Sequence, residues 1–393
     1  MVGSLLVAFF LSVLLISIFR PVAFRYGMVD APCLRKRHEG AVPLVGGLAV
    51  YLTVLICSLI FPFWSAGSGH WLIAMGGLLL LMGMADDRWD LSATRRFGVE
   101  ICCGLFAALY CGVVLEDLGQ LIPGLGGSLY MFAVPVTVIG MVGAINAMNM
   151  TDGVDGLAGG LSALTLAALA LLAIRKDMEM ALQLASMVAA IVGFLVFNSR
   201  FFGRKRAAIF MGDGGSIFIG FAIVWYLIQL SQGPNAVITP VSALWLFAVP
   251  LLDTLTIMIR RISKGNSPFA ADREHLHHIL LLAGFGVNRA VLIILSFQSL
   301  CILIGVSSLY FKVPSWVMFW LFAGLFASYY AMMNHAWMLM KRVKSFREWA
   351  GFECRRSESR GPSGRRKHAD RRLNRADFDG ENRRIGKLRR AEK

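Results

Sequence analysis

Long apolar runs recur along most of this chain, and they limit its fold more than any other feature of the sequence. A run of about eighteen residues can cross a hydrocarbon core of about 30 Å as an α-helix, which satisfies its own backbone hydrogen bonds. The composition agrees, since 57% of the residues are hydrophobic and only 16% are charged, whereas water-soluble domains contain about 25% charged residues. We therefore expect an all-α polytopic membrane protein.

Hydropathy predicts about eleven transmembrane helices. Their expected ranges are Leu5–Phe19, Leu44–Trp64, Trp71–Ala85, Phe97–Leu115, Tyr130–Ile145, Leu157–Ile174, Met180–Phe197, Ser216–Leu230, Val241–Ile259, Val291–Phe311 and Trp316–Met340. The Lys and Arg residues of the short connections are divided unequally, with seventeen on one side of these spans and three on the other. Because cytoplasmic connections carry the excess of positive charge, we predict a periplasmic N-terminus and a cytoplasmic C-terminus.

The chain divides into residues 1–340, which hold all the predicted spans, and a basic tail at 341–393. The tail contains 19 of the 39 Lys and Arg residues against 8 acids, and it has few aliphatic residues, which is typical of a disordered segment. Positive charge beside a span favours contact with anionic membrane lipids. We do not expect nucleic acid as a partner, because few aromatic side chains are interleaved to stack on bases.

Polar residues interrupt the apolar pattern between the fifth and sixth predicted spans. This connection carries Asn146, Asn149, Asp152 and Asp155, together with glycines that permit the close approach of a ligand. Charged groups beside hydrocarbon are costly and are usually functional. Hard oxygen donors of this kind suit a divalent cation and phosphate, and the structural alternative is a polar turn that joins two helices.

Two further acidic segments are predicted to lie at the same face. Asp86, Asp87 and Asp90 follow the third span, and their like charges repel unless a cation such as Mg²⁺ lies between them. Asp90 alone is explained equally well as an N-cap of the fourth span. Asp213 stands among three glycines at the start of the eighth span, where we expect it to bind metal, whereas Ser216 can serve as an N-cap.

Three histidines lie close together before the tenth span. On a helix, His275 and His278 would share one face and His277 would point away from it. The spacing lacks the fourth ligand and the cysteines that are typical of zinc sites, so it favours binding of a diphosphate together with Arg273. The role of Asp253, in the ninth span, is undecided from the sequence. It could belong to the site or form a structural ion pair with a nearby arginine.

Two basic clusters add cations at the same predicted face. The first contains Lys36 and His38 and the second contains Arg204, and both can anchor phosphates, although both also serve the positive-inside rule. A proton-coupled transporter would instead place its ionisable groups near the middle of the membrane. The pattern therefore favours an enzyme that acts on a membrane-embedded substrate over a transporter, or over a scaffold that recruits partners through the basic tail.

Taken in chain order, these motifs resemble those of the polyprenyl-phosphate N-acetylhexosamine-1-phosphate transferases, over roughly residues 20–290. The motifs are Asp86-Asp87, Asn146–Leu157, Phe210–Ser216 and Asp272–His278, preceded by Arg37-His38 and Val42–Gly47. The histidine motif is similar to that of the WecA branch, because Leu276 interrupts the run of consecutive histidines usual in the peptidoglycan branch. CDP-alcohol phosphotransferases also use Asp-Gly-rich motifs, but they have an Ala-Arg pair where this chain has Gly159-Gly160.

The resemblance implies transfer of GlcNAc-1-phosphate from UDP-GlcNAc to undecaprenyl phosphate, with release of UMP and dependence on Mg²⁺ or Mn²⁺. Such an enzyme would lie in the bacterial inner membrane and begin the synthesis of O-antigen, common antigen or a related envelope polysaccharide. Another UDP-N-acetylhexosamine, including UDP-MurNAc-pentapeptide, is an alternative donor. The sequence does not fix the oligomeric state, and a homodimer is among the states it allows.

The same resemblance implies a role for each matching position. Asp213 would hold the metal with Asp86 or Asp87, one of which would also serve as general base. The remaining positions would bind substrate: Asn146, Asn149, Asp152 and Asp155 the nucleotide sugar; Arg273, His275, His277 and His278 the diphosphate or nucleotide; Lys36, His38 and Arg204 further phosphate oxygens.

Overall fold

The computed structural model describes residues 2–30, 41–64, 68–201, 203–234, 236–267, 275–336, 340 and 342–343. The named elements all lie within one compact unit, Met1–Arg342. The predicted basic tail lies almost entirely outside the described residues, as do Lys36, His38 and Arg273.

The regular structure of the described residues is helical, apart from one short hairpin and an isolated β-bridge between Asp117 and Ser128, which confirms the all-α prediction. The helices are α1 (Val2–Tyr26), α2 (Gly46–Ile60), η1 (Pro62–Trp64), α3 (Gly69–Trp89), α4 (Ala93–Leu109), η2 (Tyr130–Phe132), α5 (Ala133–Thr151), α6 (Leu157–Ala173), α7 (Met178–Asn198), α8 (Gly212–Ser231), α9 (Pro240–Leu246), α10 (Ala248–Ser263), α11 (Leu276–Leu282), α12 (Val287–Tyr310) and α13 (Ser315–Asn334). The hairpin pairs β1 (Val29–Asp30) with β2 (Val42–Pro43) in antiparallel register.

Every predicted span coincides with a helix, but fewer helices than expected have the length and hydropathy to cross a membrane. Seven of the described helices meet that requirement, and the count rises to eight if α9 and α10, which are bent by 86°, form one broken span. The other three predicted spans correspond to α2, α4 and α6, which are only 15 to 17 residues long. The protein is therefore multi-pass, and the expected count of eleven is not confirmed.

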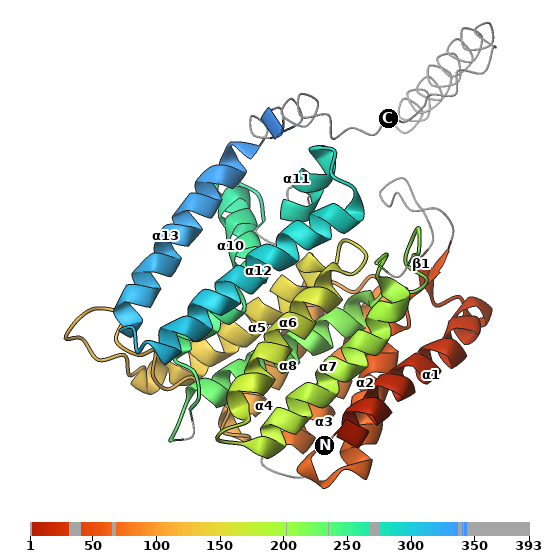
Figure 1. The fold of residues 1–393 in the computed structure, drawn as a ribbon, viewed down its shortest axis with the longest axis horizontal. Coiled ribbons are helices and arrows are strands. Elements are labelled where there is room, and N and C mark those ends of the chain that lie inside the picture. Colours follow the sequence, from red (N-terminus) through yellow and green to blue (C-terminus); the bar gives the residue numbers. More distant parts are fainter. Residues whose placement is uncertain are drawn as a thin grey trace, which may run out of the picture. The chain divides into compact units, whose positions relative to one another are not determined.

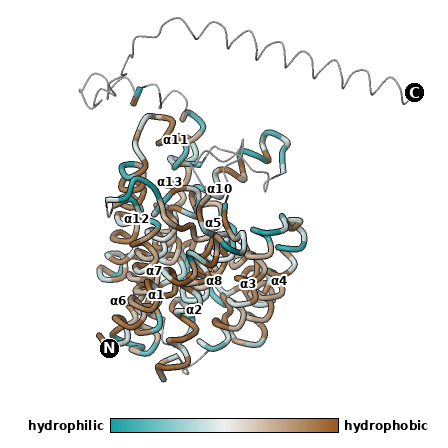
Figure 2. The backbone as a smooth tube through the Cα atoms, turned by 90° about the vertical axis from the view of Figure 1, so that its right-hand side faces the viewer, coloured by the Kyte–Doolittle hydropathy of each residue, from teal (hydrophilic) through white to brown (hydrophobic). Residues whose placement is uncertain are grey.

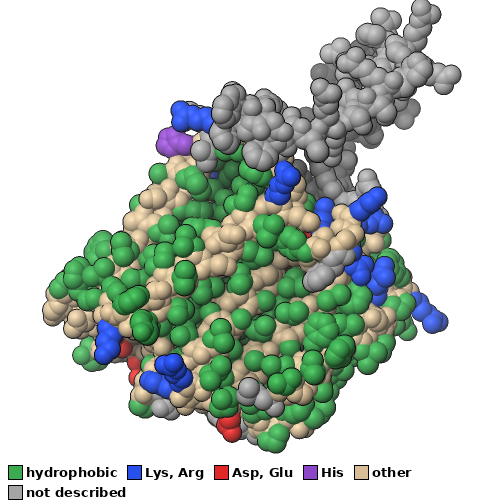
Figure 3. Space-filling view, viewed as in Figure 1, with side chains coloured by type: hydrophobic (Ala, Val, Ile, Leu, Met, Phe, Trp, Pro, Cys, Tyr) green, Lys and Arg blue, Asp and Glu red, His purple; other side chains and the backbone are tan. Residues whose placement is uncertain are grey.

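Helix α8 forms the centre of the bundle, with α2, α3, α5 and α6 packed around it (Figure 1). Within its apolar window 94% of the residues are buried, whereas the corresponding value is 22% in both α1 and α13. Figure 2 shows apolar residues along the helices and polar residues at their connections. In Figure 3 hydrophobic side chains cover the flank of the bundle and charged side chains gather toward its ends, as expected for a membrane-embedded flank.

Glycines let α8 approach its neighbours closely at the end where Asp213 lies. A Cβ on Gly47 would overlap the backbone of Gly215, and a Cβ on Gly83 would overlap that of Gly214. Backbone bonds fix the same region, since Gly47 N–H donates to the carbonyl of Met211 at 2.9 Å. The first turn of α8 is thus held between the start of α2 and the last turns of α3.

Candidate active site

Two acidic motifs meet where the C-terminal turn of α3 reaches the first turn of α8. The carboxylate of Asp87 accepts a hydrogen bond from the backbone N–H of Asp213 at 3.0 Å, and the N–H of Gly214 also donates to it. An anion in this position is stabilised by the N-terminal end of the helix. The side chain of Asp213 nevertheless places a second negative charge close to that of Asp87.

Asp152 brings the third acidic motif into the same cluster. It follows the last residue of α5 directly, and its side chain is partly buried. Burial, followed by the negative charges of Asp213 and Asp155, raises the pKa of Asp152 to about 7. The structure thus brings Asp87, Asp152 and Asp213, which are far apart in the sequence, into one region. We call these three residues the acidic cluster.

Asp86 has a different environment from Asp87 although the two are adjacent. Its side chain is buried, and its two oxygens accept hydrogen bonds from the backbone N–H of Leu91 at 2.8 Å and from Arg96 Nη1 at 2.6 Å. Glu100, which is 1% exposed, lies near this ion pair and accepts a hydrogen bond from Asn146 Nδ2 at 2.6 Å. Asp86 and Asn146 therefore join a network that ties α3, α4 and α5 together.

Glu100 has no place among the sequence-predicted site residues. The signal that could have found it is a lone acid within the fourth predicted span, because a carboxyl group in an apolar run needs a partner.

Two predicted helix caps, Asp90 and Ser216, need correction. Asp90 caps the C-terminus of α3 with φ of 50°, and the N-cap of α4 is Ser92. Ser216 lies inside α8, because the helix begins four residues earlier.

The remaining residues of the Asn146–Leu157 motif hold the loop in place. Asn149 Oδ1 accepts a hydrogen bond from Ser216 Oγ at 2.9 Å, which links α5 to α8. Asp155 accepts from Arg200 Nε at 2.6 Å and from the N–H of Ala207 at 3.0 Å. These contacts attach the loop between α5 and α6 to the connection that follows α7.

The three histidines form one compact group at the start of α11. The ring centroid of His277 lies 5.5 Å from that of His275 and 4.3 Å from that of His278. The prediction that His277 points away is wrong, since its side chain is only 3% exposed. The reason is that α11 begins at Leu276, so that His275 is an extended N-cap residue and helical spacing does not apply to it.

His277 also contacts the loop that carries Asp152. A Cβ on Gly153 would overlap His277 Nε2, so the imidazole rests on the backbone of that glycine. Burial, followed by the charges of His278 and His275, lowers the pKa of His277 to about 3, and the ring is therefore neutral at physiological pH. Within the described part of the chain, Nε2 of His277 has no hydrogen-bond partner. A buried nitrogen without a partner is costly, and here it can serve a ligand.

Asp253, which the sequence left open, is joined to this histidine group. Its carboxylate lies 2.8 Å from His275 Nδ1 and accepts from the N–H of Leu276 at 3.0 Å and the hydroxyl of Tyr329 at 2.8 Å. Asp253 is on α10 and Tyr329 is on α13. Arg204, in contrast, is exposed, and its guanidinium lies over the ring of Phe197, 5.5 Å from the centroid.

No three His, Cys, Asp or Glu side chains of the described residues converge closely enough to form a ready-made metal site. Two carboxylates with mutual repulsion nevertheless suit Mg²⁺, which is commonly bound by one or two carboxylates together with substrate phosphates. Asp87 and Asp213 fit this arrangement. The metal-binding assignment stays a prediction.

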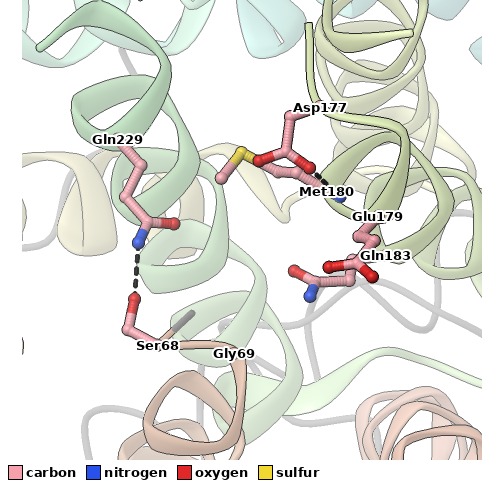
Figure 4. A pocket seen from close by; sticks show the side chains of 7 residues that line it. All are labelled: Ser68, Gly69, Asp177, Glu179, Met180, Gln183 and Gln229. Atoms are coloured by element: carbon pink, nitrogen blue, oxygen red, sulfur yellow. Dashed lines mark hydrogen bonds between the residues drawn. The ribbon is translucent and has the colours of Figure 1, made fainter. Parts of the chain in front are cut away.

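A small polar cavity of about 50 Å³ lies at the other end of the same helices (Figure 4). It is lined by Ser68, Gly69, Asp177, Glu179, Met180, Gln183 and Gln229. Ser68 precedes α3, whose last turn carries Asp87, and Gln229 is near the end of α8, whose first turn carries Asp213. This cavity is thus separate from the acidic cluster.

Comparison with known proteins shows which class of protein this fold and site define. Residues 70–231 match glycosyl transferase family 4, and this range contains the acidic cluster. Together with the relatives below, the match shows that the chain belongs to this family and is a membrane phosphoglycosyl transferase.

Similar proteins include undecaprenyl-phosphate alpha-N-acetylglucosaminyl 1-phosphate transferases from several bacteria. The one from Yersinia pestis is 38% identical over 351 residues, covering 88% of this chain and 94% of the relative. Those from Escherichia coli K12 and Pasteurella multocida are 36% and 35% identical over 352 and 351 residues, covering 87% and 89% of this chain and 94% and 98% of the relatives. The resemblance stated from the motifs is confirmed.

Proposed function

We propose that this protein transfers GlcNAc-1-phosphate from UDP-GlcNAc to undecaprenyl phosphate, giving undecaprenyl-diphosphate-GlcNAc and UMP. The observation that carries the proposal is the meeting of Asp87, Asp152 and Asp213 beside the loop on which His277 rests. Relatives that share more than a third of their residues with this chain carry this activity in their names. The product would enter O-antigen, common-antigen or related polysaccharide synthesis.

The chemistry requires positioning and charge neutralisation more than activation of the nucleophile. A phosphate monoester has a second pKa of about 6, so the lipid phosphate is already largely dianionic at neutral pH. Its oxygen attacks the sugar-bearing phosphorus of UDP-GlcNAc, a new P–O bond forms, and the P–O bond to UMP breaks with the electron pair leaving on UMP. A bound Mg²⁺ or Mn²⁺ would neutralise charge on the diphosphate oxygens.

Within this scheme we assign Asp87 and Asp213 as the residues that would hold the metal. Asp86 is less suitable, because hydrogen bonds from Leu91 and Arg96 already engage both of its carboxylate oxygens. Asp87 can also accept the proton from the fraction of lipid phosphate that is still protonated. Asp152 lies next to Asp213 and would line the donor site.

The histidine group supports binding of the uridine nucleotide or its diphosphate. His277 is neutral and buried, and its Nε2 lacks a partner within the described residues, so this atom can accept or donate one hydrogen bond to the donor substrate. His275 and His278 flank it, with their ring centroids 5.5 and 4.3 Å from that of His277. Arg273, Lys36 and His38 would add positive charge, but they lie outside the described residues.

We further propose an inner-membrane enzyme with a periplasmic N-terminus and with its acidic cluster at the cytoplasmic face. The distribution of seventeen against three basic residues in the connections supports this orientation. In this arrangement α2, α4, α6 and the bent α9–α10 pair also cross the membrane, which would give eleven crossings. Contact of the basic tail with anionic lipid and formation of a homodimer belong to the same set of proposals.

A UMP-release assay on the purified full-length protein tests the proposed function. With undecaprenyl phosphate and Mg²⁺, UDP-GlcNAc should give the highest kcat/KM in a panel that includes UDP-GalNAc, a UDP-deoxy-amino sugar and UDP-MurNAc-pentapeptide. Excess EDTA should abolish UMP release, and added Mg²⁺ or Mn²⁺ should restore it. Preference for another UDP-sugar would change the donor only, whereas full turnover in EDTA would overturn the metal assignment. Transport of a nucleotide sugar without UMP release would favour the transporter.

A further inference from the structure

The C-terminal helix α13 makes a hydrogen bond that reaches the histidine group through one intermediate residue. Tyr329 is 4% exposed, and its hydroxyl donates to Asp253 Oδ1 at 2.8 Å. The other oxygen of the same carboxylate lies 2.8 Å from Nδ1 of His275, which is 6% exposed. Asp253 itself is 5% exposed. Three buried groups from three separate segments thus form a continuous chain.

The chemistry of the carboxylate determines the state of His275 Nδ1. An ionised carboxylate only accepts hydrogen bonds, and Asp253 already accepts from Tyr329 and from the N–H of Leu276. The proton of the third contact must therefore be on Nδ1 of His275. A hydrogen bond at one ring nitrogen fixes both the ring orientation and which nitrogen is left for a ligand.

The orientation of His275 is passed on to the ring that faces the loop after α5. The rings of His275 and His277 are stacked with an interplanar angle of 12°. His277 in turn rests on Gly153, next to Asp152 of the acidic cluster. The hydrogen bonds of Asp253 lead to His275, Leu276 and Tyr329, so Asp253 and Tyr329 would act on the site through His275.

We propose that Asp253 and Tyr329 are positioning residues for the donor nucleotide. They hold His275, and through it His277, so that α10 and α13 complete a site whose acidic part lies on α3, on α8 and directly after α5. This inference rests on the proposed function for the identity of the nucleotide. It also extends the site beyond residues 70–231, the range that matches the family.

Nucleotide affinity of the full-length protein in neutral detergent tests this proposal, with UMP and UDP-GlcNAc as titrants in calorimetry. Tyr329→Phe should raise both dissociation constants by about 3- to 10-fold, the loss expected for one hydrogen bond in a buried network. Asp253→Asn should raise them by about 10- to 100-fold, as for other residues that orient a ligating histidine. Tyr330→Phe, the same change at the next residue of α13, should leave both constants unchanged.

A double-mutant cycle separates positioning from a purely structural role. If Tyr329 acts through His275, Tyr329→Phe should have no further effect on nucleotide affinity when His275→Ala is already present. Equal dissociation constants for Tyr329→Phe and the wild type, with only a lower Tm, would overturn the proposal, as would fully additive effects in the cycle. If the wild-type protein binds nucleotide but releases no UMP, the proposed reaction is refuted. The effect of Tyr329 and Asp253 on nucleotide affinity can still be measured in that case.

Discussion

The two ends of the helix bundle both carry aspartates next to helix termini, yet these aspartates have opposite surroundings. At one end, Asp177 Oδ1 accepts a hydrogen bond from the N–H of Met180 at 2.9 Å and caps α7. Gln183, which lines the same cavity (Figure 4), also has its amide satisfied. It donates to the carbonyl of Phe63 at 2.7 Å and accepts from the hydroxyl of Tyr226 at 3.0 Å. Neutral donors and acceptors therefore satisfy Asp177 and Gln183 at this end.

At the other end, Asp213 lies close enough to both Asp87 and Asp152 for its charge to repel theirs. Clusters of this kind cost free energy of folding, and perturbed ionisable groups gather at functional sites. The comparison teaches that an aspartate at a helix terminus is structural when backbone N–H groups satisfy it and no other carboxylate is close. It is a candidate for chemistry when further carboxylates lie beside it, as for Asp87.

The largest expected effect comes from making the same substitution at both ends. Asp213→Asn removes a charge from the acidic cluster and should lower kcat by about 10²- to 10³-fold, the loss typical of one electrostatic contact to a transition state. Asp177→Asn should leave kcat unchanged, because Asn and Asp are equally good N-caps. UMP release by both variants, at saturating Mg²⁺, measures the difference. Equal kcat values for Asp213→Asn and Asp177→Asn would mean that the acidic cluster is no more important for catalysis than the N-cap of α7.

The second prediction concerns the contact between the two parts of the site. Gly153→Ala would place a methyl group on His277 Nε2, and the ring or the loop must then move. Because misplacement by about 1 Å can cost about 10²-fold in rate, we expect kcat/KM for UDP-GlcNAc to fall by about 10- to 100-fold. Gly143→Ala, on the exposed side of α5 with open space around it, should have no effect. A fully active Gly153→Ala enzyme would show that His277 does not take part in donor binding.

Local patterns were sufficient to predict the helices and to single out the acidic residues, because both depend on short stretches of sequence. Apolar runs give the positions of the spans, and Asp87, Asp152 and Asp213 each stand at the boundary of such a run. The orientation of His277 was not predictable, because it depends on α11 beginning one residue after His275.

Contacts between distant segments were also beyond the sequence. Asp253 and Tyr329 are 76 positions apart, and only the packing of α13 against α10 brings them together. The predicted count of eleven membrane crossings is not confirmed by helix length. Hydropathy predicts apolar runs over Leu44–Trp64 and Leu157–Ile174, whereas α2 and α6 contain only 15 and 17 residues.

The third prediction uses the raised pKa of Asp152. In the unfolded chain this carboxyl titrates near 3.8, and in the folded protein near 7. Between about pH 4 and about pH 7 the folded state therefore binds more protons, so the free energy of unfolding falls as pH rises through this window and is constant above it. Asp152→Asn should remove the part of this fall that Asp152 contributes, whereas Asp177→Asn should keep it.

Thermal unfolding in neutral detergent without divalent cations, at about pH 5 and about pH 8, checks this sign. We expect the wild-type Tm to be lower at the higher pH by a few degrees, and the Asp152→Asn variant to show a smaller difference. Added Mg²⁺ should raise the wild-type Tm at the higher pH, because a cation favours the ionised carboxylates. A wild-type Tm that is higher at about pH 8 than at about pH 5, with no such rise in the Asp152→Asn variant, would contradict the raised pKa of Asp152.

The smallest effect is expected outside both ends of the bundle, in the basic tail. Deleting Arg355–Lys393 removes a segment without any of the motifs that define the acidic cluster or the histidine group. Its positive charge can act on lipid only through electrostatic attraction, which salt screens over about 8–10 Å. We therefore expect the truncated enzyme to keep its kcat in neutral micelles. In anionic vesicles at low salt its apparent affinity for undecaprenyl phosphate should fall, and raising the salt concentration should abolish the difference from the full-length enzyme.

A truncated enzyme that is inactive in neutral micelles, with its Tm unchanged, would contradict this prediction. The tail would then belong to the catalytic unit, and function would not be confined to the acidic end of the bundle and the histidine group.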